Sequence, residues 1–140
     1  MPSKIIYVYS DGGARGNPGP SAIGVLLCDE KGNIIEDYSE VISENATNNV
    51  AEYSGVIVGL ELAKKNGAKE VRYYLDSELA AMQLSGKYKV KAPHILTLHT
   101  QAKKLEQAFE KVVYTHVPRT HEKIRYVDKL VNQALDEAGH

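Results

Sequence analysis

Four carboxylates lie at or near the predicted ends of secondary-structure elements, where their side chains could meet. Two of them, Asp11 and Asp76, stand at the ends of the predicted strands "KIIYVYS" and "EVRYYLD". The other two, Glu52 and Asp128, lie near the starts of predicted helices. Half-buried acids need a partner, and no arginine or lysine is placed to serve all four. A divalent cation would serve them, and all-oxygen ligands suit Mg²⁺ or Mn²⁺ rather than zinc.

A structural role is the alternative for each acid taken singly. Asp11 begins an Asp-Gly pair, which is a common turn signal. Glu52 follows Asn49 by three residues and would fit the glutamate position of a capping box. Asp76 could cap the helix that begins near Ser77, although the Ser77 hydroxyl can do so itself. It is the four acids together that indicate a metal site.

Asp128 is the acid that a surface role explains least well. Asp128, Val131 and Leu135 stand at i, i+3 and i+7, so they share one helical stripe. That stripe is otherwise apolar, which predicts that it faces the sheet. We therefore expect the Asp128 side chain at the sheet or its edge rather than fully in water.

The elements that must position these acids follow the order β-β-β-α-β-α-α-β-α. Strands are predicted over 4–10, on both sides of the turn Asp29–Asn33, over 70–76 and over 112–118, and helices over 50–67, 77–86, 93–111 and 121–139. Three leading strands predict an antiparallel meander, and the later strands predict parallel additions through right-handed crossovers. We expect one α/β domain over residues 1–140, with a mixed five-stranded sheet and helices on both faces. Asp11 and Asp76 then lie close together if the first and fourth strands are neighbours.

The composition is that of an ordinary globular protein without strongly basic character. The chain has 140 residues, of which 43% are hydrophobic and 25% charged, and its net charge is −1. Any nucleic-acid contact must therefore come from a local patch. The single cysteine, Cys28, excludes an internal disulfide and stands in an apolar run, so we expect it to be buried. Because no stretch is long enough to span a membrane and no secretory signal is present, we expect a cytoplasmic protein. We also expect a monomer.

The segment "YSDGGARGNPGP" (Tyr9–Pro20) has four glycines and two prolines in twelve residues. A phosphate-binding loop is one interpretation, but the segment lacks the Lys-Ser/Thr of a P-loop and is followed by strands rather than a helix. Its glycines would let the backbone approach a substrate closely. Arg15 within it could contact a phosphate or be a solvated loop charge, and both interpretations remain open.

Four segments, in order, resemble the type 1 ribonuclease H family over nearly the whole chain. They are "DGGARGNPGPSAIGVLL", "TNNVAEYSGVIVGLELA", "YYLDSELAAMQLSG" and "VDKLVNQALDEA". The second segment carries the glutamate and the other three carry the aspartates. Four motifs at these separations are far more specific than any one of them.

The resemblance implies an endonuclease that hydrolyses the RNA strand of RNA–DNA hybrids and leaves 5′-phosphate and 3′-hydroxyl ends. It implies two divalent ions, Mg²⁺ or Mn²⁺, bound with the substrate by Asp11, Glu52, Asp76 and Asp128, with Asp11 as the bridging ligand. The substrate contacts that carry over by position are Gly12, Asn17, Thr47, Asn48, Asn49 and Arg119. Activity on double-stranded RNA or another nucleic acid is the alternative for a related metal-dependent nuclease of this fold.

The chain departs from the family pattern where the long bacterial form carries a basic insertion. Only "GKYKVKAPH" (86–94) stands there, so the chain resembles the short form of the family. The lysines of this segment could contact the phosphates of the DNA strand or form a solvated loop: they are Lys87, Lys89 and Lys91.

A histidine or arginine ahead of the last aspartate often assists catalysis in this family. His121 and Arg119 both qualify, and we favour His121, seven residues before Asp128, for product departure or proton movement. A histidine in this role predicts a rate that depends on pH near about 6–7. His116, within the predicted strand "VVYTHVP", is interpreted as structural.

Two rival functions are a non-catalytic nucleic-acid-binding module and another nuclease of the wider fold, such as an exonuclease, resolvase or integrase core. A pure binder gains nothing from four acids that repel phosphate. The wider nucleases share the metal chemistry but lack the glycine-rich opening and the "TNNVAE" helix start.

Overall fold

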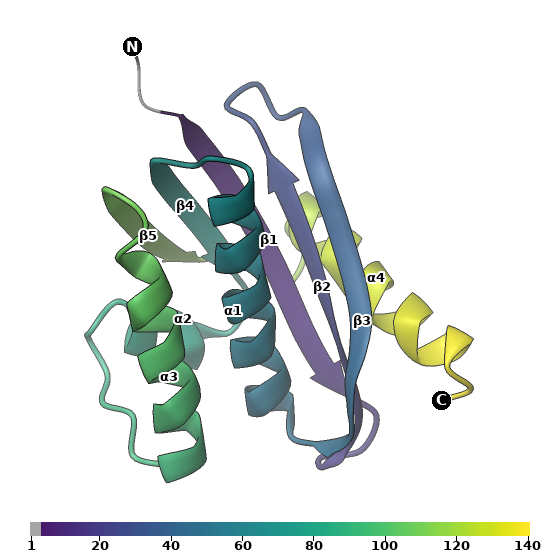
Figure 1. The fold of residues 1–140 in the computed structure, drawn as a ribbon. Coiled ribbons are helices and arrows are strands. Elements are labelled where there is room, and N and C mark those ends of the chain that lie inside the picture. The colour runs from purple at the N-terminus through teal and green to yellow at the C-terminus, as the bar shows by residue number, and fades with distance from the viewer. Residues whose placement is uncertain (1–3) are drawn as a thin grey trace.

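A five-stranded mixed sheet forms the centre of the computed structural model, which describes residues 4–140 (Figure 1). Its strands are β1 (Ile5–Ala14), β2 (Gly19–Cys28), β3 (Ile34–Ala46), β4 (Glu70–Leu75) and β5 (Lys111–His116). They lie side by side in the order β3-β2-β1-β4-β5. The first three pair antiparallel, whereas β4 and β5 pair parallel to β1 and to each other. The predicted meander with parallel additions is confirmed.

Helices cover both faces of this sheet, as predicted (Figure 1). They are α1 (Asn48–Lys65), α2 (Glu78–Leu84), α3 (Pro93–Glu106) and α4 (Glu122–Glu137). The larger core packs α1, α2 and α3 against one face, with Val8 and Leu60 among its buried side chains. On the other face α4 buries Val127 against Tyr9 and Leu26. Within residues 4–140, no helix is both long and apolar enough to cross a bilayer.

Strand β1 is longer than the sequence indicated, because the predicted strand ended at residue 10. The glycine-rich segment continues as strand, since β2 pairs with it as far as Ala14 opposite Ser21. Its parallel pairing with β4 stops earlier, at Tyr9 opposite Tyr74. Asp11 therefore does not end its strand, but it lies two residues beyond this last parallel pair, as Asp76 does.

The start of α1 also differs from the expectation. Strand β3 runs on to Ala46, and Thr47 is the residue that caps the helix, with its Oγ1 accepting from the Val50 amide at 3.2 Å. Asn49 is therefore not the cap, and Glu52 is not a capping-box glutamate. At α2 the expected cap is confirmed, because Ser77 Oγ accepts from the Ala80 amide at 3.1 Å.

Candidate functional site

Three of the predicted acids meet at the end of the parallel part of the sheet. Asp11 comes from β1, Glu52 from the second turn of α1, and Asp76 from the residue after β4. Each offers a carboxylate oxygen, and these oxygens all lie within 4.8 Å of one another. Asp128, from the first half of α4, lines the same cavity. The four acids, scattered over 118 positions of the sequence, thus border one space.

Helix α1 is held against β1 by two of its polar side chains. The amides of Gly12 and Ala14 lie on the edge of β1 that β4 no longer pairs. Gly12 donates to Glu52 Oε1 at 3.1 Å and to Asp11 Oδ1 at 3.0 Å, and Ala14 donates to Asn48 Oδ1 at 2.8 Å. Because residues 48 and 52 are one helical turn apart and residues 12 and 14 share one strand edge, the helix supplies the acceptors that a strand would.

This contact requires glycine at position 12. A Cβ there would lie 2.2 Å from the carbonyl carbon and oxygen of Ala51, which is backbone and cannot turn aside. At the adjacent Gly13, an added Cβ would meet only Val131 Cγ1, at an ordinary 3.6 Å. Gly12 was predicted as a substrate contact, and the structure gives it a packing role as well.

We expect Gly12→Ala to destabilise the protein by about 2–3 kcal/mol, because it forces α1 away from β1. The matched control is Gly13→Ala, which should stay within about 1 kcal/mol of the wild type. The midpoint of denaturant unfolding measures both. Equal midpoints for the two variants would show that the contact between Gly12 and the Ala51 backbone leaves room for a methyl group.

Burial raises the pKa of two of the clustered acids. Glu52 is buried, its Oε2 has no hydrogen-bond partner within the described part of the chain, and its pKa lies well above the usual 4.5. Desolvation is the main cause, followed by the neighbouring Asp11 carboxyl. Burial, with the charges of Asp76 and Asp128, raises the pKa of Asp11 to about 6. A buried carboxylate oxygen without a partner, beside two further acids, fits a divalent cation.

Asp128 is placed differently from the other three acids. Its neighbours on the predicted stripe, Val131 and Leu135, are buried, whereas Asp128 itself is exposed at the rim of the cavity. Asn132, one turn later, donates through Nδ2 to the Asp128 backbone oxygen at 3.0 Å and to Oδ2 at 3.5 Å. Asn132 is not among the residues predicted from the sequence, although its position four residues after an acid on the same helix was a usable signal.

The predicted substrate contacts also line this cavity: they are Gly12, Asn17, Thr47, Asn48, Asn49 and Arg119. Two of the asparagines already use their side-chain oxygens within the protein. Asn17 Oδ1 accepts from the backbone N–H of Asn48 at 3.0 Å, and Asn48 Oδ1 accepts from the backbone N–H of Ala14. A bound substrate would therefore meet the Nδ2 donors of these two residues.

Of the two basic candidates, the structure brings Arg119 to the cavity rather than His121. Arg119 lines the cavity, and its Nε lies 3.5 Å from Asp76 Oδ2. His121 caps α4 with Nδ1, which accepts from the Lys123 amide at 3.1 Å, and its ring packs against Tyr9. The spacing that favoured His121 thus coincides with a helix start, where an acceptor is needed for an amide.

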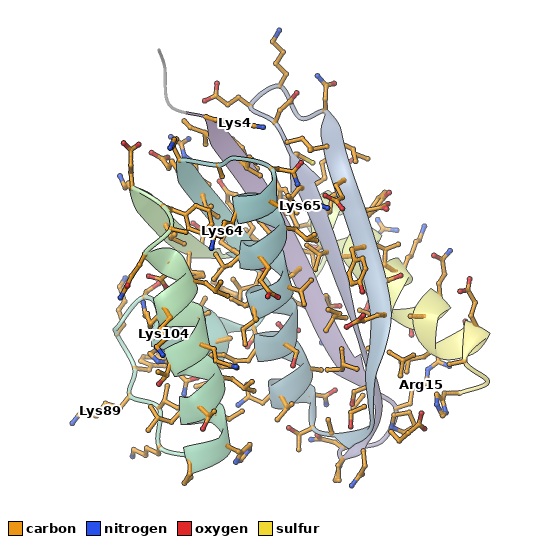
Figure 2. All side chains as sticks on the ribbon, in the orientation of Figure 1. Lys4, Arg15, Lys64, Lys65, Lys89 and Lys104 are labelled. Carbon is orange, nitrogen blue, oxygen red and sulfur yellow. The ribbon has the colours of Figure 1, made fainter. Side chains whose placement is uncertain are left out.

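A second cavity adjoins the first and holds two of the three loop lysines. Lys89 and Lys91 line it together with Tyr88, and it shares Asn49 and Leu79 with the first cavity. Lys89 points outward from the loop between α2 and α3 (Figure 2). Basic side chains therefore lie at one end of the acidic site.

The chain is similar to known proteins over almost its whole length. The profile of a family described as reverse transcriptase-like matches residues 9–134. The "Bifunctional protein Rv2228c" of Mycobacterium tuberculosis is 41% identical over 140 residues, which cover 96% of this chain and 36% of that protein. The "Ribonuclease HI" of Halobacterium salinarum is 38% identical over 134 residues, 95% of this chain and 65% of that protein. The chain thus spans only part of both relatives.

Solved structures agree with these matches. The N-terminal RNase H domain of Rv2228c superposes with a TM-score of 0.91 at 40% identity, covering 98% of this chain and 97% of that one. LC11-RNase H1, solved in complex with an RNA/DNA hybrid, superposes with a TM-score of 0.89 at 41% identity, covering 96% of this chain and 99% of that one.

Proposed function

The chain belongs to the type 1 ribonuclease H family, and from that premise we propose that it is an endonuclease that hydrolyses the RNA strand of RNA–DNA hybrids. The observation that carries the proposal is the cluster of Asp11, Glu52 and Asp76, in which one buried carboxylate oxygen has no partner among the described residues. Such a cluster favours a bound cation. The products would carry 5′-phosphate and 3′-hydroxyl ends.

The acids would hold two divalent ions, Mg²⁺ or Mn²⁺, when substrate is bound. Asp11 would be the shared ligand, with Glu52 and Asp76 on one ion and Asp128 on the other. When bound, two such ions supply an activated water, stabilisation of the leaving oxygen and relief of phosphoryl charge. The chain itself orients this set, because the Gly12 amide holds Glu52 and Asp11 together.

Recognition of RNA would depend on the polar residues along the cavity. The 2′-hydroxyl distinguishes RNA from DNA in the wide minor groove of a hybrid. The Nδ2 groups of Asn17 and Asn48 are donors available for it, and Asn49 lines the same wall. Lys89 and Lys91 lie where they could contact phosphates of the DNA strand.

A panel of labelled nucleic acids tests the proposal. With Mg²⁺ or Mn²⁺, the protein should cut the RNA strand of a hybrid and spare duplex DNA and single strands, and it should be inactive with EDTA. End analysis of the fragments checks the 5′-phosphate. Preferred cleavage of double-stranded RNA would support the related-nuclease alternative, and tight hybrid binding without cleavage would support a binding module.

We propose Arg119, in place of His121, as the basic group that assists the reaction. Arg119→Ala should slow cleavage by about 100-fold, the size expected for loss of one preorganised charge contact. His121→Ala should lower stability by about 1 kcal/mol through loss of the helix cap, with little change in rate. Single-turnover rates and unfolding midpoints measure the two effects. A larger rate loss for His121→Ala than for Arg119→Ala would show that His121 is the basic group that assists the reaction.

The monomeric state, the cytoplasmic location and the single-domain organisation stay predictions from the sequence.

A further inference from the structure

Arg15 joins the loop after β1 to the C-terminal half of α4 (Figure 2). Its Nη1 lies 2.7 Å from Asp136 Oδ1, an ion pair between two side chains 121 positions apart. Its Nη2 donates to Asn132 Oδ1 at 3.2 Å and approaches the Asn132 backbone oxygen at 3.4 Å. The guanidinium is therefore engaged on both arms, with its charge balanced by an acid outside the metal cluster.

Asn132 connects this contact to the acidic site. A guanidinium can only donate, so it must face the oxygen of the Asn132 amide rather than the nitrogen. The amide nitrogen is thereby turned toward Asp128, where it donates to the backbone oxygen at 3.0 Å and to Oδ2 at 3.5 Å. Asn132 Nδ2 is thus a neutral donor to the Asp128 carboxylate, which otherwise faces the acid Asp11.

Asp128 needs such support more than the other acids do. Glu52 and Asp11 are buried and share the Gly12 amide, whereas Asp128 is exposed on a helix surface. An exposed side chain that binds a ligand must first lose its rotamer freedom. A neighbouring donor that already holds the carboxylate reduces this cost, as outer-shell hydrogen bonds to metal ligands generally do.

We propose that Arg15 is a positioning residue which, through the Asn132 amide, holds the Asp128 carboxylate at the cavity and so raises the affinity of the site for a divalent cation. The inference rests on the proposed function only in taking Asp128 as a metal ligand. It also answers the question left open for Arg15, because the guanidinium acts within the protein rather than on a substrate phosphate.

Calorimetric titration of Mn²⁺ into the metal-free protein, without substrate, tests this directly. Arg15→Gln and Asn132→Ala should each weaken Mn²⁺ binding by about tenfold, the lower end for outer-shell partners. Arg125→Gln, which removes the same charge from the exposed face of α4, is the matched control and should bind as the wild type does. Equal affinity of the wild type and Arg15→Gln, including no binding by either, would overturn the proposal.

A double-mutant cycle separates positioning from general loosening of the structure. If Arg15 acts through Asp128, Arg15→Gln should have almost no further effect on Mn²⁺ affinity in an Asp128→Asn background. The same tenfold loss in both backgrounds would overturn the proposal. Arg15→Lys keeps the charge but not the planar fork that reaches both partners, so it should retain most of the defect. Full rescue by lysine would overturn the route through Asn132.

Binding of the hybrid in EDTA tests the rival role on phosphate. A residue that contacts one phosphate reduces the slope of log affinity against log salt by about 0.9 when it is removed. Arg15→Gln should instead give the same slope as Arg125→Gln, and a smaller slope for Arg15→Gln alone would favour a phosphate contact over positioning. If the wild type fails to cleave any hybrid, the proposed function fails, while the Mn²⁺ titrations still decide whether Arg15 positions Asp128.

Discussion

Asp11→Asn is expected to reduce cleavage of a hybrid by at least about 1000-fold and, at the same time, to stabilise the metal-free protein at about pH 7.5. Loss of one preorganised electrostatic contact typically costs about 100- to 1000-fold in rate, and here the proposed shared ligand of the two ions is lost. The gain in stability has a separate cause: the carboxyl is buried and lies beside Glu52 and Asp76, and its pKa is raised to about 6. At neutral pH its ionised form is therefore unfavourable, and a neutral amide removes about 1–3 kcal/mol of that cost.

Initial rates on labelled hybrid and the denaturant midpoint in EDTA measure these two effects on the same protein samples. Glu61→Gln makes the same change of charge on the exposed side of α1, and it should alter neither quantity. An Asp11→Asn variant that cleaves as the wild type does would contradict the proposed site. A variant that is inactive but less stable than the wild type would show that attractive contacts of the Asp11 carboxylate outweigh the cost of burying its charge.

The metal-free protein is expected to lose stability as the pH rises from about 5 to 7.5. The Asp11 carboxyl titrates at about 6 in the folded protein and at 3.8 ordinarily, so the folded state binds its proton more tightly. Its contribution to stability is complete below pH 3.8 and is lost as the pH passes through about 6, which amounts to about 3 kcal/mol at most. The raised pKa of Glu52 acts in the same direction. Asp29 and Glu36, whose pKa values are lowered by hydrogen bonds, act below this window.

Urea unfolding in EDTA at several pH values checks this trend. Added Mg²⁺ or Mn²⁺ should reverse it, because the ligands must be deprotonated to bind, and a concentration of 100 times the Kd adds about 2.7 kcal/mol. The Glu52→Gln variant should show a weaker dependence on pH and on metal, with Glu61→Gln as its control on the same helix. A stability that rises steadily from about pH 5 to 7.5 in the wild type without metal would contradict the raised pKa values.

That the four acids would lie around one cavity could be predicted because their neighbours in the sequence carry strong local signals. Asp76 follows a strand of alternating apolar residues, and Asp128 stands on an apolar helical stripe. The end of β1 could not be predicted in the same way. Glycines at 12 and 13 indicate a loop by local preference, and only pairing with β2, which is set by the whole sheet, keeps them extended.

The choice between His121 and Arg119 shows a second limit of the sequence. Distance along the chain favoured His121, but α4 begins at the next residue and uses the imidazole Nδ1 to satisfy an amide. Arg119 lies in the connection before the helix, and its long side chain spans the distance to Asp76. Which side chain reaches the site depends on the direction of the chain at the end of β5, which residue spacing does not contain.

The unequal lengths of the two pairings of β1 have a consequence for how this site could be altered. Beyond Tyr9, β1 has a strand on one side only, and the amides of Gly12 and Ala14 on the open side are bound by Glu52 and Asn48. Helix α1 thus supplies the acceptors that a strand would supply. The space between β1 and Asp76 exists because β4 does not continue beside β1 beyond Tyr9. We expect that insertion of two strand-forming residues at the end of β4 would extend its parallel pairing with β1 and close this space. Such an insertion would abolish the site with every acid still present, so the shape of the sheet edge is as much a determinant of function as the residues it displays.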